Sequence, residues 1–357
     1  MLNLSPNGCS VWVTNQPELA LKPTAVALGK FDGVHRGHQR VIKPISSNRE
    51  MGLNFNSRFE EEVIRTPQAQ LPTSVNKHIY STVVTFNPHP QEFFSGKPRT
   101  LLTPLNEKIQ QLGTLGVEQL VLLPFDRELC SLTPEEFVER ILVQQLQATQ
   151  ISIGHDFRFG SERSGTARDL QVIASKYNIP VKIVPLEIDK IGEDQAQDIP
   201  IEMTRISTSL IRSVLEEGDV ERASQLIGRP YTLYGNVTKG QQLGRKIGFP
   251  TANLELPKDK FLPRLGVYAV RVFDVTDVHE QLQFIAFGVM NIGNRPTVNG
   301  TNITTEIHLI DWSGDLYNRK LAVELEKFLR PETKFASLEA LKNQIQLDCC
   351  AAKVFFG

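Results

Sequence analysis

The sequence predicts an α/β domain built on a parallel sheet, followed by a small β-barrel domain. Its 357 residues exceed what one hydrophobic core usually holds, which favours two domains. Short apolar runs alternate with amphipathic stretches through the first half, as in strands joined by helical crossovers. After Gly228-Arg229-Pro230 the chain turns to short β-rich runs with Gly and Pro turns, which favours a barrel. We therefore predict domains over residues 1–228 and 229–357.

The predicted strands of the first domain are Thr24–Leu28, Ser81–Phe86, Leu120–Phe125, Ile151–Gly154 and Val181–Leu186. Helices are expected from Gly37, Thr103, Thr133 and Thr166, with two short helices over Ser207–Ile227 that are separated by a bend at Gly218-Asp219. Thr103 is expected as a helix N-cap before Pro104, and Thr133 is expected to form a capping box with Glu136. Residues 53–79 are polar and irregular and contain prolines, so we predict a disordered surface insertion there.

The second domain is expected to contain five strands and a closing helix. The predicted strands are Tyr231–Val237, Gly266–Phe273, Phe284–Asn291, Ile303–Asp311 and Leu321–Phe328, and the helix covers Ser337 to about Ala352.

Composition narrows the class of protein. Hydrophobic residues make up 40% and charged residues 22%, which is ordinary for a globular chain. The net charge of −1 and the lack of a Lys/Arg run predict no nucleic-acid partner. We find neither a signal-peptide pattern at the start nor an apolar run near the ~20 residues that span a bilayer. Four cysteines without metal spacing fit a reducing compartment. We expect a cytoplasmic protein with no membrane partner.

A glycine-rich turn follows the first strand and opens the first helix. Glycines such as Gly29 and Gly33 let the backbone turn tightly, while the free N–H groups of the helix start favour phosphate. His35 and His38 are three residues apart, so both can project from one face of the first turn and donate hydrogen bonds to an α-phosphate. The alternative is two surface histidines on a turn.

A second phosphate-binding element is expected near residue 207. Ser207, Thr208 and Ser209 supply three hydroxyls at a helix start, and Arg212 follows one turn later. The alternative is an ordinary Ser/Thr helix cap. The strings containing Asn87 and Asp156 end predicted strands, where open α/β sheets bind ligands, although loop packing explains them equally well.

The second domain carries a glycine-rich loop with two cations. Gly240, Gly244, Arg245, Gly248 and Pro250 lie in this loop, which could fold over a phosphate chain. Thr251 and Asn253 offer hard oxygen ligands suited to Mg²⁺. The alternative is a barrel hairpin.

Glu306 lies in an alternating run, so it shares a strand face with His308, while Ile307 lies on the other. If the Glu306 face looks into a substrate mouth, Glu306 can act as a general base; if it looks outward, it is a solvated acid.

Taken together and in order, these strings resemble the bifunctional riboflavin kinase/FAD synthetases of bacteria. The H-x-G-H string at 35–38 is typical of the nucleotidyltransferase superfamily. The other matching strings are T-F-x-P-H-P at 85–90, G-x-D-F-x-F-G at 154–160, G-R-P-Y at 228–231, G-R-x-x-G-F-P-T-A-N at 244–253 and E-x-H-L at 306–309. The resemblance covers nearly the whole chain except the predicted insertion.

The resemblance implies a Rossmann-like nucleotidyltransferase domain that transfers AMP from ATP to FMN, giving FAD and pyrophosphate. His35 and His38 would steady the triphosphate, Ser207, Thr208, Ser209 and Arg212 would hold the released phosphates, and Asp156 would lie near flavin or nucleotide. Gly29, Phe31, Gly33 and Asn87 would complete the ATP/FMN site.

The barrel would be a riboflavin kinase that binds riboflavin and ATP with Mg²⁺. Thr251 and Asn253 would lie at the metal, and Glu306 would activate the ribityl 5′-hydroxyl. We call the second phosphate-binding element, residues 207–212, the clamp. It begins Ser-Thr-Ser-Leu where many relatives carry Ser-Ser-Thr-Arg, which leaves Arg212 without a second arginine.

Three rival functions differ in what they require. A tRNA-linked enzyme predicts a basic barrel and a lysine-containing clamp, and a decayed flavin-binding regulator predicts loss of Glu306, Thr251 or His38; the sequence has none of these features. A monofunctional FMN adenylyltransferase with an inactive flavin-binding barrel is the main alternative.

Overall fold

The computed structural model describes residues 11–46, 78–190, 203–239, 244, 248–276, 282–297 and 300–357. Gly240, Arg245 and positions 53–77 of the predicted insertion lie outside these residues. The last two positions of that predicted insertion are part of the fold. His78 Nε2 lies 3.1 Å from Glu118 Oε1, and Ile79 packs against the core.

The first domain is built on a six-stranded sheet with the order β1-β4-β3-β2-β5-β8, and every neighbouring pair is parallel. Its strands are β1 (Trp12–Thr14), β2 (Thr24–Leu28), β3 (Tyr80–Asn87), β4 (Gln119–Pro124), β5 (Ala148–Gly154) and β8 (Val181–Val184). The chain proceeds from β2 to β3 and β4 on one side and reaches β5 and β8 on the other. The carboxyl ends of β2 and β5 therefore border the crevice in which open α/β sheets bind ligands.

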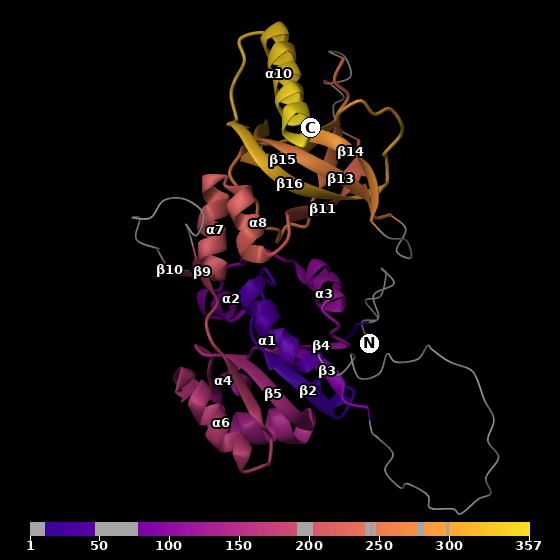
Figure 1. Cartoon of the computed structure of the whole chain (residues 1–357). Coiled ribbons are helices and arrows are strands. Elements are labelled where there is room, and N and C mark those ends of the chain that lie inside the picture. The colour runs from indigo at the N-terminus through magenta and orange to yellow at the C-terminus, as the bar shows by residue number, and fades with distance from the viewer. Residues whose placement is uncertain are drawn as a thin grey trace, which may run out of the picture.

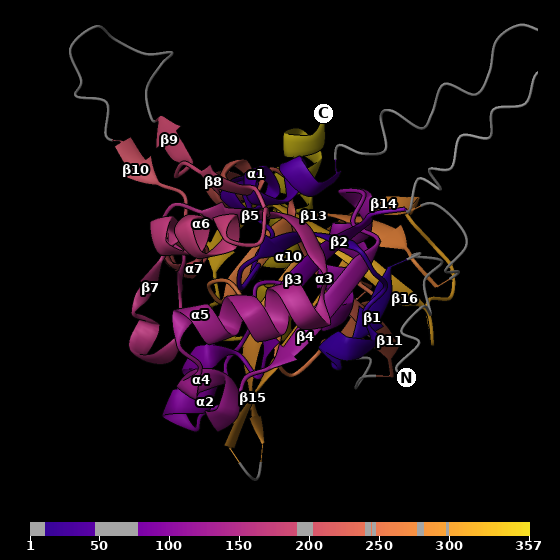
Figure 2. The ribbon, with the colours of Figure 1, turned by 90° about the horizontal axis from the view of Figure 1, so that it is seen from below.

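Helices cover both faces of this sheet (Figures 1 and 2). Helices α1 (Arg36–Ser46) and α3 (Leu105–Thr114) bury their apolar side chains on one face. The other face is covered by the π-helix η3 (Phe137–Gln145) and by α6 (Ala167–Ser175). The shorter elements are η1 (Pro17–Leu19), α2 (Pro90–Ser95), α4 (Arg127–Ser131), α5 (Pro134–Glu136), β6 (Arg158–Phe159), η4 (Ser161–Arg163), β7 (Gly165–Thr166), β9 (Ile188–Lys190) and β10 (Met203–Arg205).

The two predicted helix caps, at Thr103 and Thr133, had different outcomes. At α5 the capping box is confirmed, because Thr133 and Glu136 each bond the other's backbone N–H. At α3 the prediction was wrong: Pro104 is the N-cap and Thr103 makes no cap bond. The Thr103 hydroxyl instead accepts a 2.9 Å hydrogen bond from Gly33 N, a long-range contact that local sequence cannot reveal.

The second domain is a closed six-stranded barrel with the order β11-β12-β15-β14-β13-β16. Its strands are β11 (Tyr231–Thr238), β12 (Ala252–Glu255), β13 (Gly266–Asp274), β14 (Gln283–Thr297), β15 (Gly300–Leu309) and β16 (Lys320–Pro331). Strand β12 was not predicted, because its residues were read as a ligand-binding loop. The closing helix α10 (Leu338–Phe356) packs on the outside of β13 and β14 (Figure 1).

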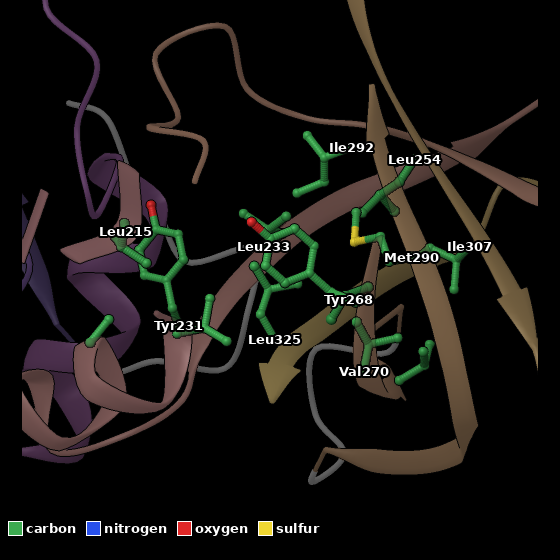
Figure 3. Packing of buried hydrophobic residues seen from close by; sticks show 14 of the residues in the cluster. Leu215, Tyr231, Leu233, Leu254, Tyr268, Val270, Met290, Ile292, Ile307 and Leu325 are labelled. Carbon is green, nitrogen blue, oxygen red and sulfur yellow. The ribbon is translucent and has the colours of Figure 1, made fainter. Parts of the chain in front are cut away.

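Helices α7 (Thr208–Glu217) and α8 (Val220–Ile227) lie between the sheet and the barrel (Figure 1). The predicted bend is confirmed, because Gly218 caps α7 at φ 91° and Asp219 caps the start of α8. Leu215 of α7 shares one hydrophobic cluster with the barrel residues Tyr231, Leu233 and Met290 (Figure 3). The two domains are therefore joined by a packed apolar core.

Within the described residues, no helix combines the length and the apolar character needed to cross a membrane.

Two candidate active sites

The loop between β2 and α1 has a strained backbone. Phe31, Gly33 and Val34 all have positive φ, at 49°, 92° and 42°. The Phe31 side chain is 1% exposed, so it forms the packed base of the loop. Gly29 leaves the space for that ring, because a Cβ there would lie 3.1 Å from it. The two predicted binding residues Gly29 and Phe31 thus shape the turn.

The two histidines of this loop are stacked on each other. Their ring centroids are 3.7 Å apart and their planes differ by 23°. Burial lowers the pKa of His35 to about 4, and burial, followed by the neighbouring His35, lowers the pKa of His38 well below its usual 6.5. Both imidazoles are therefore neutral near pH 7, and each carries one N–H for a hydrogen bond to phosphate.

Asp32 connects this loop to the predicted clamp. Its buried carboxylate accepts a 3.0 Å bond from Arg212 Nη2, and its carbonyl accepts a bond from the Thr208 hydroxyl. Ser207 Oγ is the N-cap of α7 and accepts from Leu210 N, whereas Ser209 is exposed. The structure thus brings the clamp helix against the histidine loop, with two of its three hydroxyls occupied by contacts within the chain.

A group of cations surrounds the histidine pair. Arg205, at the end of β10, forms an ion pair with Asp156 from the loop after β5. Lys108 of α3 donates a 3.2 Å bond to the Lys30 carbonyl. The charges of Lys108 and Arg205 act on His38 in addition to burial and His35. Among the described residues, the carboxylates of Asp32 and Asp156 also act on His35, so a polyanion placed here would meet both the cations and these two acids.

The end of β3 contributes a third histidine. Asn87 is exposed at the last position of β3, and His89 Nδ1 accepts from Gln91 N at the start of α2. Burial, followed by the charges of Lys30 and Arg99, lowers the pKa of His89 to about 4. The charge of Lys108 acts on both His38 and His89, which connects the end of β3 to the histidine pair.

The second site is assembled on two adjacent barrel strands. Asn253 of β12 lies opposite Glu306 of β15 in the antiparallel register. Thr251 donates a 3.4 Å hydrogen bond from Oγ1 to Glu306 Oε2. The three predicted kinase residues, 55 positions apart at their extremes, are brought together. No cluster of three or more His, Cys, Asp or Glu suited to a metal occurs among the residues described.

The structure shows on which side of strand β15 the Glu306 side chain lies. Ile307 is 1% exposed inside the barrel core, so Glu306 points away from that core and is half-buried on the outer side. Part of this outer surface is covered by the segment that precedes Thr251. His308 Nδ1 lies 2.9 Å from the Pro250 carbonyl, and the His308 ring packs edge-on against Phe249. The segment carrying Thr251 is therefore fastened to the strand carrying Glu306.

Glycines shape the loop that precedes Thr251. Gly244 approaches so closely that a Cβ would lie 2.2 Å from the Phe249 carbonyl oxygen, and Phe249 N donates to the Gly244 carbonyl. Gly248 is exposed with φ 88°. A side chain at either position would disturb the turn that delivers Pro250 and Thr251.

Sequence reasoning missed Arg205, His89 and Lys108 at the first site. Arg205 lies two residues before Ser207, and His89 lies inside a motif that was singled out, so both had a local signal. Lys108 had none, because only the fold brings α3 to the loop after β2.

Two family models match the chain. The model described as riboflavin kinase matches residues 227–356, which contain the barrel. The model described as FAD synthetase matches residues 18–58 and 62–195, which contain strands β2, β3, β4, β5 and β8 of the parallel sheet. The two descriptions correspond to the two sites found in the fold.

Curated relatives match over nearly the whole chain. A bifunctional riboflavin kinase/FMN adenylyltransferase from Pseudomonas fluorescens is 36% identical over 91% of this chain and 91% of its own length. One of the same description from Escherichia coli K12 is 35% identical over 93% of this chain and 92% of its own. A crystal structure described as a macrolide-efflux protein from Streptococcus pneumoniae is 28% identical, covers 96% of this chain and 99% of its own, and has a TM-score of 0.74. The chain therefore belongs to the family of bifunctional riboflavin kinase/FMN adenylyltransferases.

Proposed function

We propose that the chain phosphorylates riboflavin to FMN in its barrel and then adenylylates FMN to FAD at its parallel sheet, using ATP for both reactions. The observation that carries this proposal is that each domain assembles its own set of reactive residues. Glu306 meets Thr251 and Asn253 in the barrel, and the histidine pair meets a group of cations in the first domain. An inactive barrel would not require Glu306, Thr251 and Asn253 to be present together at one site.

In the kinase reaction, the ribityl 5′-hydroxyl oxygen bonds to the γ-phosphorus of ATP, and the bond to the β,γ-bridging oxygen breaks to release ADP. Glu306 accepts the hydroxyl proton. Its half-buried carboxylate, already within reach of the Thr251 hydroxyl, is placed to do so. Gly244, Gly248 and Pro250 shape the loop that would lie along the ATP phosphates, and we extend that assignment to Gly240 and Arg245 from their sequence position.

The Thr251 hydroxyl and the Asn253 side chain fit a Mg²⁺ ion. Both supply oxygen donors, and the adjacent Glu306 adds negative charge without closing an all-protein cage. Such an open donor set suits Mg²⁺, which keeps several waters and binds substrate phosphates. When bound, the ion would neutralise charge on the transferring phosphoryl group.

In the adenylyl transfer, an FMN phosphate oxygen bonds to the α-phosphorus of ATP, and the bond to the α,β-bridging oxygen breaks to release pyrophosphate. His35 and His38, both neutral, donate hydrogen bonds to the charge that develops on the phosphate. Lys30, Lys108 and Arg205 offset the charge of the triphosphate and the pyrophosphate.

Several contacts of the first site stay predictions. Ser209 and the N–H groups at the start of α7 are available to the released phosphates, whereas Arg212 is already paired with Asp32 and holds the loop. Asn87 and Asp156 are assigned to the flavin or nucleotide from their position at strand ends. We place the domain boundary near residue 228 and the activity in the cytoplasm, where ATP is supplied.

The proposal is tested by incubating the pure protein with riboflavin, ATP and Mg²⁺ and resolving the flavins by chromatography. FMN should form first and FAD should follow with release of pyrophosphate. FAD formed from FMN but never from riboflavin would leave only the adenylyltransferase.

A further inference from the structure

The loop that presents the histidine pair needs outside support to keep its shape. Val34 has φ 42°, a left-handed conformation that costs free energy for a β-branched side chain. Such conformations persist only where surrounding contacts determine them. Val34 directly precedes His35, so any relaxation of its backbone would move the imidazoles.

Two side chains hold the carbonyls of this strained segment. Arg229 donates from Nη2 to the Gly33 carbonyl at 3.1 Å and from Nη1 to the Val34 carbonyl at 3.3 Å. Gln39 of α1 donates to the Val34 carbonyl and to the Ile227 carbonyl, each at 3.0 Å. The Gly33 N–H is held from the other side by Thr103. The bonds from Arg229, Gln39 and Thr103 thus fix the Gly33-Val34 backbone, and the bond to Ile227 holds the Gln39 side chain in place.

Arg229 is placed by the barrel side of the molecule. It lies between the end of α8 and the first barrel strand β11, two residues before Tyr231, which is 3% exposed in the barrel core. Gly228, just before it, approaches α1 so closely that a Cβ would lie 3.3 Å from Arg36. The guanidinium therefore reaches the loop from a rigid, closely packed position, and its fork matches two successive carbonyls.

We propose that Arg229 is a positioning residue for adenylyl transfer: it holds the Gly33-Val34 backbone so that His35 and His38 face the phosphates. The proposal rests on the proposed function of the first site. It means that a residue at the root of the kinase barrel is required for the reaction catalysed in the other domain, and not for the kinase reaction itself.

The test compares two arginine variants of the full chain. Arg229→Met removes both carbonyl contacts, and Arg319→Met, the matched control, removes a barrel arginine that pairs with Asp274. Two bonds from a charged donor correspond to about 10²-fold to 10⁴-fold in rate when their whole contribution is lost in the transition state. We expect kcat for FAD formation from FMN to fall by that factor in Arg229→Met, with the KM for FMN within about threefold. Riboflavin phosphorylation, measured in the same sample, should match that of the parent and of Arg319→Met.

A conservative variant separates positioning from charge. Arg229→Lys keeps the charge but replaces the two-pronged fork by a single nitrogen, so its rate should lie between those of the parent and Arg229→Met. Parental FAD formation in Arg229→Lys or in Arg229→Met would overturn the proposal, as would equal loss of both activities in Arg229→Met. If the parent itself formed no FAD, the proposed function would fail, and this outcome is distinct from failure of the positioning role.

Discussion

The buried ion pair between the two domains gives the most demanding prediction for stability. Lys260 of the barrel domain donates to Glu107 of α3 and, at 2.9 Å, to the Leu102 carbonyl. Its ammonium lies 4.6 Å from the centre of the Tyr231 ring. Burial lowers the pKa of Lys260 and raises that of Glu107, while each partner's charge opposes the shift of the other. Both groups therefore depend on the pair to remain charged.

Lys260→Met leaves the Glu107 carboxylate buried without a counter-ion, which costs about 3–5 kcal/mol. An unfolding entropy of about 2.1 cal/mol/K per residue gives about 0.75 kcal/mol/K for 357 residues, so Tm should fall by about 4–7 °C. Adding Glu107→Gln removes the stranded charge and should restore more than half of the loss. Glu107 can avoid the cost of a buried, unpaired charge by binding a proton at low pH. The fall in Tm caused by Lys260→Met should therefore be larger at pH 8 than at pH 5.

Differential scanning calorimetry of the parent, both single variants and the double variant completes the cycle. Lys327→Met is the matched control, since Lys327 and Glu221 form a more exposed contact of 3.8 Å between β16 and α8. Lys327→Met should lower the free energy of unfolding by less than about 1 kcal/mol. A Lys260→Met shift as small as that of the control, or a double variant no more stable than the single one, would refute the reasoning.

Three further outcomes are expected. Glu306→Gln keeps the side-chain shape but cannot accept a proton, so riboflavin phosphorylation should fall by about 10²–10⁴-fold while FAD still forms from supplied FMN; a near-parental kinase rate would make Glu306 a solvated acid. Because the pKa of His35 is about 4 in the fold and 6.5 when unperturbed, the unfolded chain binds the extra proton. The free energy of unfolding should therefore drop by about 3 kcal/mol as the pH falls from about 6.5 to 4, and urea titrations of His35→Gln should show a shallower drop. Replacing residues 53–77 by a short Gly/Ser linker, with His78 and Ile79 retained, should leave both activities within a few-fold, and loss of either in a folded variant would count against dispensability.

Local sequence patterns predicted the elements whose causes are local. The apolar run Thr24–Leu28 became β2, and the bend at Gly218 became the cap between α7 and α8. The resemblance assigned Asn253 and Glu306 to one site, and the two residues lie opposite each other in the register of β12 and β15, while their roles stay predictions.

The failures came from contacts between distant parts of the chain. Thr103 gave up its helix cap to bond Gly33, which is 70 positions away, and no local pattern contains that competitor. Lys260 and Arg229 bond residues more than 150 positions away, so neither was assigned a role. Arg205 shows a milder case, since its partner Asp156 had been singled out while Arg205 itself, two residues before the clamp, had not.

Complementation between two variants tests most directly whether one chain holds two separable catalytic sites. His38→Ala should convert riboflavin to FMN without forming FAD, because the histidine pair lies in the first domain. Glu306→Gln should form FAD only from supplied FMN, because Glu306 lies in the barrel. Mixing the two variants with riboflavin, ATP and Mg²⁺ should restore FAD, which chromatography of the flavins would detect. A mixture that accumulates FMN without FAD, or a His38→Ala variant that forms no FMN, would contradict the account.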